Sequence, residues 1–514
     1  MLERQERGTL SGGNDATGST AERSGDPYTR LGVRPFINCC GSRTVHGGSL
    51  MLPAVVDAIT HAAGSFVNLT ELMVAAGRRI ALLTGAEAAL VTSGGAASLT
   101  AAAAGAITKG DPERMLRLPR TEGMPHRVVM PKGARFTYDH AIRATGAEIL
   151  EVADRAQMQV ALASDAVLIA TIGTKDGALP IGLEECAALA APKGIPILLD
   201  AASEHLQRPN PYLVRGATMV AYSGGKYLRG PQSTGLLLGE RSWIEAARLN
   251  AAPHHAIGRP MKVSKEEIVG LVAAIEFWAE ARDHGAERKR WQDDLDQIAA
   301  LVTAVAGVSV ETLGSSKAHE EVPRLRIAWD RCRIGLGGLE LRETLLAGEP
   351  RIMLDDRGAT EGSVFILPFN LAPGEAAIVG RAIAAALAAA PPVAAAAPTA
   401  PAGDVSGNWE VEIAFAAARS IHRLELTQSG LRLAGTHRTL GLTGALAGTI
   451  EGNRVAFTSL HPYEGSNLSY AFSGMIEGAA MAGEVLLGTS GDSAPGPLNM
   501  REFGAAAWQA RRRA

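Results

Sequence analysis

The 514-residue chain has few cysteines, few aromatic residues and no excess of either charge. Its four cysteines are too few for a disulfide framework, and Cys39 and Cys40 are adjacent rather than spaced as in a zinc-binding pair. Fifty Lys and Arg oppose 53 Asp and Glu, giving a formal net charge of −3, which disfavours nucleic acid as a partner. These absences predict a protein of the reducing cytoplasm.

Long hydrophobic segments are also missing. The Ala-rich runs are broken by Gly, Pro or charged residues before they reach the length of a membrane span. Residues 1–30 are polar and rich in Gly, Ser and Thr, without the apolar centre of a signal peptide. We therefore expect no membrane partner, a soluble protein, and a disordered tail over residues 1–30.

Alternating helix-like and strand-like segments fill most of the chain. In residues 31–255, short apolar runs alternate with helical patterns, which predicts a large α/β domain with a mostly parallel sheet. Residues 256–389 begin with a long helix, because Ser264 and Glu267 have the spacing of a capping box. Further helices and strands follow, so this region is expected to form a smaller α+β domain.

The C-terminal part has a different pattern. An Ala/Pro-rich linker over residues 390–404 precedes a stretch, residues 405–514, in which apolar and polar residues alternate between Gly- and Asn-rich turns. This indicates a separate antiparallel β-domain, either a sandwich or a small barrel. Its aromatic residues are expected to pack in the core rather than to line a pocket: Trp409, Phe457, Tyr463 and Tyr470. We identify no catalytic constellation in it.

The most informative motif is Ser223-Gly224-Gly225-Lys226, which follows an apolar run. A lysine on a Gly-rich turn at a strand end can point into a cleft and form a Schiff base with a carbonyl cofactor, although a solvated loop lysine is an equal alternative. Asp200 ends another buried strand 26 residues earlier. Pyridoxal phosphate needs an aspartate at its ring nitrogen, so the combination favours that cofactor.

Two further motifs fit the same cofactor. Ser93, Gly94 and Gly95 connect a strand to a helix, and the helix N-terminus there is suited to a phosphate, although a simple packing turn has the same composition. The turn is neither a P-loop nor a dinucleotide fingerprint. His140, beside Tyr138, precedes another helix and could stack on the cofactor ring, although a lone histidine is more often a surface or capping residue.

Together these motifs resemble the pyridoxal-phosphate enzymes of the aspartate-aminotransferase fold, fold type I. They are most similar to the selenocysteine-synthase-like branch, which includes D-glucosaminate-6-phosphate ammonia-lyase. The resemblance covers residues 31–390 and leaves the β-domain outside. It is carried by Asn38 with Gly41, Leu83–Ala89, Val91–Gly94, Leu199–Glu204, Tyr222–Lys226 and Ile257–Glu266.

The resemblance implies a role for each matching residue. Lys226 would hold the cofactor, Asp200 would pair with its ring nitrogen, and His140 would stack on its ring. Fold type I enzymes assemble as homodimers or larger homo-oligomers with shared active sites, so a partner subunit would be needed. The remaining implied contacts are Ser93, Gly94, Gly95 and Ser223 with the phosphate, Ser203 with the phenolic oxygen, and Arg259 and Lys262 from the partner subunit.

The chain departs from the family at the expected substrate carboxylate anchor. Asn370 follows an apolar strand where relatives tend to carry an arginine; Arg43, Arg259 or Arg351 could replace it. Relatives that act on tRNA carry an extra N-terminal domain, whereas about thirty polar residues precede the matching region here. This difference weakens the selenium-transfer alternative.

The pattern as a whole predicts a pyridoxal-phosphate lyase that eliminates ammonia from a β-hydroxy amino acid or an amino-sugar acid. Lys226 and Asp200 would serve equally in transamination, racemisation or selenium transfer to seryl-tRNA, so these alternatives stay open. A non-catalytic binding protein that retains the fold is the alternative from another class. No metal is expected, because His254 and His255 lack further ligands at suitable spacing.

Overall fold

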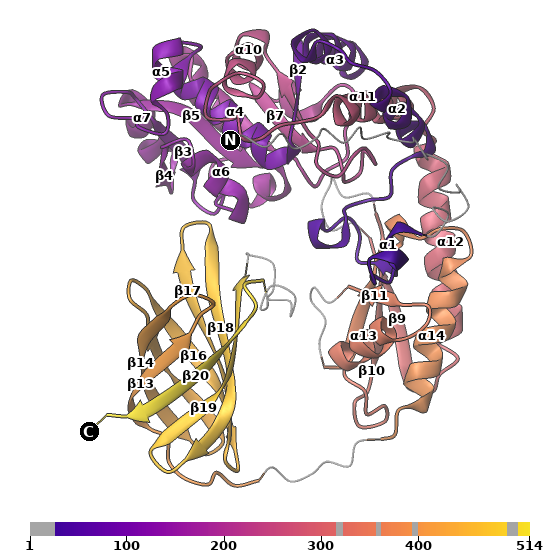
Figure 1. Cartoon of the computed structure of the whole chain (residues 1–514), viewed down its shortest axis with the longest axis vertical. Helices are drawn as coiled ribbons and strands as arrows, with labels where there is room; N and C mark the ends of the chain where they lie inside the picture. The colour runs from indigo at the N-terminus through magenta and orange to yellow at the C-terminus, as the bar shows by residue number, and fades with distance from the viewer. Residues whose placement is uncertain (1–25, 315–321, 356–360, 393–398, 491–501, 514) are drawn as a thin grey trace, which may run out of the picture.

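The computed structural model describes residues 26–314, 322–355, 361–392, 399–490 and 502–513. The described residues form an α/β layer, a smaller α+β unit and a β-barrel (Figure 1). Each of these parts has its own large hydrophobic core. Most of the predicted disordered tail lies outside the described residues. Its last residues, Pro27–Arg30, form a short helix (α1), because Asp26 accepts hydrogen bonds from the first-turn N–H groups and proline suits the first helical position.

The α/β layer contains a seven-stranded sheet in the order β2-β8-β7-β6-β5-β3-β4. Only β8 runs antiparallel to its neighbours, which confirms the mostly parallel sheet predicted from the buried apolar runs. The strands are β2 (Ala88–Thr92), β3 (Arg127–Pro131), β4 (Glu148–Val152), β5 (Ala166–Ile172), β6 (Ile197–Asp200), β7 (Met219–Ser223) and β8 (Gly235–Gly239).

Helices cover this sheet, and α4 is almost entirely buried because it consists of small residues. Gly105 on α4 allows close contact with α10, since a Cβ at this position would collide with the backbone of Ala246 and Ala247. The helices are α2 (Pro53–Ala63), α3 (Leu69–Thr84), α4 (Gly94–Thr108), α5 (Pro112–Arg117), α6 (His140–Arg143), α7 (Arg155–Ala163), α8 (Leu183–Ala190), α9 (Pro211–Val214), α10 (Arg241–Asn250) and α11 (Lys265–Glu280).

The smaller α+β unit packs three helices against a three-stranded antiparallel sheet in the order β12-β10-β9. A separate parallel pair, β1 with β11, extends the same core. The elements are β1 (Ile37–Cys39), α12 (His284–Val302), β9 (Val308–Leu313), β10 (Arg324–Trp329), α13 (Gly338–Ala347), β11 (Ile352–Leu354), β12 (Ser363–Ile366) and α14 (Glu375–Ala389).

Two domain boundaries differ from those expected from the sequence. The sequence pattern predicts one large domain over residues 31–255, yet Ile37 and Cys39 of β1 belong to the core of the smaller unit. Conversely, α11 begins at the predicted capping box but packs into the large core against α2 and α3. An amphipathic pattern identifies a buried face without showing which core receives it, so these assignments required the tertiary structure.

Residues beyond the linker form a closed eight-stranded barrel in which each strand pairs with the next and β20 pairs with β13. The fold prediction is confirmed as a barrel, not a sandwich. Three of the four aromatic residues expected in its core are buried, whereas Tyr463 is 56% exposed. The strands are β13 (Gly407–Ala414), β14 (Arg419–Ser429), β15 (Arg432–Arg438), β16 (Thr443–Glu451), β17 (Arg454–Tyr463), β18 (Ser466–Glu477), β19 (Ala480–Ser490) and β20 (Ala505–Arg512).

A buried histidine cluster, His422, His437 and His461, lies inside the barrel. His437 connects the other members: its Nε2 lies 2.8 Å from Nδ1 of His422, and its Nδ1 lies 3.0 Å from Nε2 of His461 and 2.7 Å from Oγ of Ser459. Burial lowers the pKa of His422 to about 4 and that of His437 to about 2, so the cluster is neutral near pH 7. Within the described residues, no three His, Cys, Asp or Glu side chains are arranged to hold a metal ion.

We expect this cluster to make the barrel acid-sensitive. The unfolded chain binds protons on these histidines below pH 6.5, whereas the folded barrel does not, so stability is full above pH 6.5 and is lost as pH falls toward 4. For His422 alone the loss corresponds to about 3 kcal/mol. Hydrogen exchange of the full chain, corrected for intrinsic rates, should show weaker protection of β14, β15 and β17 at about pH 5 than at about pH 7.5.

The central strands of the large sheet provide the internal reference for that experiment. Strands β5 and β6 contain no histidine, so their protection should change less than that of the barrel strands. Equal protection of the barrel strands at both pH values would contradict the expected linkage between protonation and unfolding.

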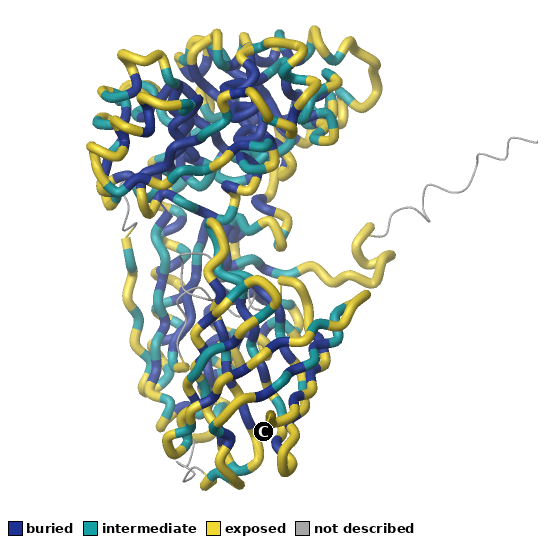
Figure 2. The backbone as a smooth tube through the Cα atoms, turned by 90° about the vertical axis from the view of Figure 1, so that its left-hand side faces the viewer, coloured by how far each residue is buried: buried dark blue, intermediate teal, exposed yellow. Residues whose placement is uncertain are grey.

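The barrel lies beside the smaller unit, and the β17–β18 end points toward α6 of the α/β layer (Figure 1). Figure 2 shows buried segments running through the α/β layer and alternating with exposed positions along the barrel strands, as expected for a sheet with one inward face. In the described parts of the chain, no helix combines the length and apolar character needed to cross a bilayer.

Candidate active site

The carboxyl ends of β6 and β7 bring the two main predicted residues to one edge of the sheet. Asp200 is the last residue of β6, and its backbone is in register with Ala221 of the parallel strand β7. Lys226 lies in the turn that begins immediately after Ser223, the last residue of β7. This edge is where open α/β sheets bind ligands.

Asp200 and Lys226 are close enough to influence each other electrostatically. Burial raises the pKa of Asp200, whose side chain is enclosed, while a hydrogen bond from the Ala202 N–H (2.7 Å) and the charge of Lys226 act in the opposite direction. A buried carboxylate next to a lysine is suited to hold a protonated ring nitrogen. The residues present therefore fit pyridoxal phosphate.

The lysine turn is held tightly by its surroundings. Ser49 Oγ donates a hydrogen bond shared between the carbonyl oxygens of Gly225 (3.0 Å) and Lys226 (2.9 Å). A Cβ at Gly225 would collide with the backbone of Gln232, so the turn requires glycine there. These contacts fix the backbone from which the Lys226 side chain projects.

The N-terminus of α4 lies next to the same edge. The helix starts at Gly94 after Ser93, whose hydroxyl makes no capping hydrogen bond, so the first-turn N–H groups lack a side-chain cap. The α-carbon of Gly95 faces Ala202 and Ser223, since a Cβ there would be in contact with both side chains. This arrangement fits the predicted phosphate site, and the contacts of Ser93, Gly94, Gly95 and Ser223 with a phosphate remain predictions.

Two residues of the predicted ring-stacking motif have different surroundings. His140 begins α6, is exposed, and places its Nδ1 2.7 Å from the carbonyl oxygen of Thr137. Tyr138 is half exposed, and its pKa is raised by burial and by the charge of Asp200. Tyr138 is thus the aromatic residue of this segment within electrostatic range of Asp200, while the stacking role of His140 stays a prediction.

Ser203 and Arg259 lie in turns. Ser203 follows β6 in a partly buried turn close to Asp200 in sequence. Arg259 belongs to a turn that is held by a hydrogen bond from the Gly258 N–H to the Asn250 carbonyl oxygen (2.9 Å). Their contacts with a cofactor, and those of Lys262, stay predictions.

The proposed carboxylate anchors are largely engaged in structural contacts. Asn370 is buried, and its Nδ2 donates to the carbonyl oxygens of Gly41 (3.1 Å) and Gly48 (3.4 Å), which braces the N-terminal segment next to the lysine turn. Arg43 forms an ion pair with the fully buried Asp355. Arg351 donates to two backbone carbonyl oxygens, of Leu346 and Arg34, both at 2.9 Å.

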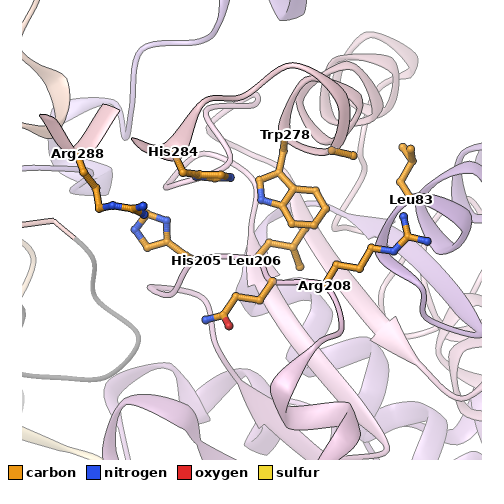
Figure 3. Close-up of a pocket in the computed structure, with 9 residues that line it drawn as sticks. Leu83, His205, Leu206, Arg208, Trp278, His284 and Arg288 are labelled. Carbon is orange, nitrogen blue, oxygen red and sulfur yellow. The ribbon is translucent and has the colours of Figure 1, made fainter. Parts of the chain in front are cut away.

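A cavity of about 430 Å³ lies between the loop that follows β6 and the helices α11 and α12 (Figure 3). Neither Asp200 nor Lys226 lines it, so it is a neighbour of the site rather than the cofactor pocket. The ring of His205, on its wall, stacks on Tyr227 with ring centroids 4.1 Å apart. The lining residues are Leu83, His205, Leu206, Gln207, Arg208, Trp278, Ala279, His284 and Arg288.

The fold places the chain among known enzymes. A solved structure described as D-glucosaminate-6-phosphate ammonia-lyase superimposes with a TM-score of 0.62 at 28% sequence identity, covering 71% of this chain and 100% of that one. The chain is therefore a pyridoxal-phosphate-dependent enzyme of fold type I. No family model matches the sequence.

Sequence relatives give the particular family. D-glucosaminate-6-phosphate ammonia-lyase of Salmonella typhimurium is 31% identical over 365 residues, covering 68% of this chain and 95% of the relative. The chain belongs to the family of that enzyme, which confirms the resemblance seen in the motifs. A Streptomyces 5'-C-glycyluridine monooxygenase-decarboxylase is 29% identical over 69% of this chain and 90% of its own length. L-seryl-tRNA(Sec) selenium transferase of Proteus mirabilis matches over only 70 residues, at 37% identity.

Proposed function

We propose that the enzyme is a lyase that releases ammonia from a β-hydroxy amino acid or an amino-sugar acid by α,β-elimination. The observation that carries the proposal is the placement of Lys226 and the buried Asp200 at one sheet edge, beside the N-terminus of α4. The 31% identical relative named an ammonia lyase supports this reaction type over the alternatives.

Pyridoxal phosphate, when bound, supplies an electron sink for the carbanion that forms when an amino acid loses its α-proton. In the proposed mechanism, Lys226 would hold the cofactor through Nζ and, once the substrate amine has taken its place, would accept the α-proton at Nζ. Asp200 would accept a hydrogen bond from the ring nitrogen and keep that nitrogen protonated. Lys226 Nζ would then return the proton to the departing β-hydroxyl, which leaves as water, and would take back its own bond to the cofactor, which frees the product as an enamine. Hydrolysis of the released enamine gives a keto acid and ammonia.

A product analysis tests the proposed reaction. The purified protein with pyridoxal phosphate should convert a β-hydroxy amino acid or an amino-sugar acid to a keto acid and ammonia in equal amounts. It should do so without an amino acceptor and without consuming oxygen. A requirement for a keto-acid acceptor would indicate transamination. Oxygen uptake with release of carbon dioxide would instead point to the chemistry named for the Streptomyces relative. Either result would contradict the elimination proposal.

We also propose that the enzyme acts as a homodimer or a larger homo-oligomer in the cytoplasm. Apolar side chains are exposed at the connection between α2 and α3, where Phe66 has its whole surface accessible and Val67 about half. An exposed apolar patch of this kind is typical of an interface between subunits. The four cysteines of the chain are too few for a disulfide framework, which suits a reducing compartment. Sedimentation velocity of the full chain tests the assembly.

A further inference from the structure

The barrel contacts the α/β layer through the hairpin that joins β17 and β18. The turn residues Glu464 and Gly465 connect the paired positions Tyr463 and Ser466. They lie against the segment Arg135–Arg143, which contains Tyr138 and leads into α6. The sequence predicts the barrel as a separate domain. Its β17–β18 hairpin nevertheless contacts the segment that leads into α6, at the edge of the candidate active site.

Ion pairs join the two surfaces. Glu464 Oε2 lies 2.5 Å from Arg135 Nη2 and 3.9 Å from Arg143 Nε. Both arginines also contact Asp139, at 2.5 Å and 3.3 Å, and the Asp139 side chain is fully buried. Arg135 is mostly buried as well, and its ion pairs raise its pKa above the usual value. Partly buried ion pairs in which two arginines share the same carboxylates stabilise a contact more than isolated ion pairs on the surface do.

The backbone of the hairpin is shaped for this contact. A Cβ at Gly465 would collide with the carbonyl oxygen of Phe136 and the carboxylate of Asp139, so only glycine allows the observed approach. Glu464 has a φ of 52°, a left-handed conformation that is unfavourable for residues other than glycine, asparagine and aspartate. Glutamate in this position gains the ion pairs that offset the conformational cost.

The clamped segment is anchored to α4, because Thr100 Oγ1 of that helix donates a hydrogen bond to the Ala141 carbonyl oxygen of α6 (2.9 Å). The pKa of Tyr138 is raised by burial, by Asp200 at the sheet edge and by Glu502, which precedes β20 of the barrel. Tyr138 therefore lies within electrostatic range of both the candidate site and the barrel. The relatives match 68–71% of this chain while being covered almost fully themselves. The part of this chain that the relatives do not match is about as long as the N-terminal tail, the linker and the barrel together.

We propose that the β17–β18 hairpin is a clamp on the active site, and that Glu464 is a positioning residue that holds the Arg135–Arg143 segment in place beside α4 and its N-terminal turn. This inference rests on the function proposed above. The barrel thereby becomes a structural part of the catalytic unit, and the reaction depends on a residue about 240 positions away from Lys226 in sequence.

The test compares two hairpin variants with a matched control in the full chain. Glu464→Gln removes the charge, and Gly465→Val introduces the predicted collision without changing any charge. Each variant should raise hydrogen exchange in residues 135–143, alter the visible circular dichroism of bound pyridoxal phosphate, and lower kcat by about tenfold while KM changes by less than about twofold. Glu477→Gln, in the hairpin at the opposite end of β18, should leave all three unchanged.

The outcomes separate the clamp from its alternatives. Wild-type dichroism and kcat in both hairpin variants would overturn the proposal, even if exchange rose, because the contact would then be merely structural. An equal effect of Glu477→Gln would also overturn it, by showing a general disturbance of the barrel. If the wild-type protein gave no elimination at all, the proposed function would fail, whereas the exchange and dichroism measurements would still decide whether the hairpin orders the site.

Discussion

Replacing Lys226 with alanine should lower the rate of elimination by at least about 10³-fold. In the proposed mechanism the change removes both the amine that would hold the cofactor and the base that would take the α-proton, so two functions should be lost together. Borohydride treatment of the wild-type protein with pyridoxal phosphate should fix the cofactor covalently on Lys226, which peptide mass spectrometry can locate. The variant should show neither the fixed cofactor nor turnover.

The control is Lys193→Ala, because Lys193 is an exposed lysine at the end of a short helical turn after α8. It should retain full turnover and the same labelling of Lys226. Unchanged turnover of Lys226→Ala would contradict the assignment of the catalytic lysine. Labelling at another lysine would show that the Gly-rich turn is only a structural feature.

The second large effect is expected for Asp200→Asn. Asparagine has nearly the same shape and can still accept the hydrogen bond from the Ala202 N–H, so folding and cofactor attachment should be retained. It carries no negative charge, however, and therefore stabilises the protonated ring nitrogen much less. We expect kcat to fall by about 10²- to 10³-fold.

Stopped-flow spectroscopy of this variant tests the role of the carboxylate. The cofactor should still be fixed on Lys226 by borohydride, whereas loss of the substrate α-proton, followed with deuterated substrate, should become rate-limiting. A variant with wild-type kcat would show that Asp200 does not act on the ring nitrogen. Loss of cofactor binding would indicate a structural role for the carboxylate instead.

The sequence was sufficient to predict that Asp200 and Lys226 lie at the same edge of the sheet. Both follow buried apolar runs, and the carboxyl ends of neighbouring parallel strands lie at one edge of a sheet, so local patterns determined their proximity. The turn between β2 and α4 is predictable for the same reason, because it also follows a buried apolar strand. These features depend on strand order and direction, which alternating helices and strands restrict strongly.

Contacts between distant segments could not be predicted in this way. The pairing of β1 with β11 and the ion pair of Arg135 with Glu464 each join residues more than 300 positions apart. Neither partner carries a local signal, because an arginine beside a helix and a glutamate before a glycine are ordinary surface features. Their roles follow only from how the barrel and the α/β layer are placed.

The histidine cluster was missed although a signal was present. His422 has the same strand parity as Leu424 and Leu426, so alternation alone places it inside the barrel. His437 and His461 follow the same rule with Leu433 and Phe457. Attention to parity would have identified three inward histidines, but not the hydrogen bonds that connect them.

The closed barrel also determines the order in which the parts of the chain can fold during synthesis. The α/β and α+β units leave the ribosome first, whereas the barrel can close only when β20, its last strand, pairs with both β13 and β19. Until then the barrel is an open sheet with two unpaired edges, which are prone to pairing with other chains. A premature stop before residue 505 would therefore release a chain in which the α/β sheet can form while the barrel keeps an aggregation-prone open edge.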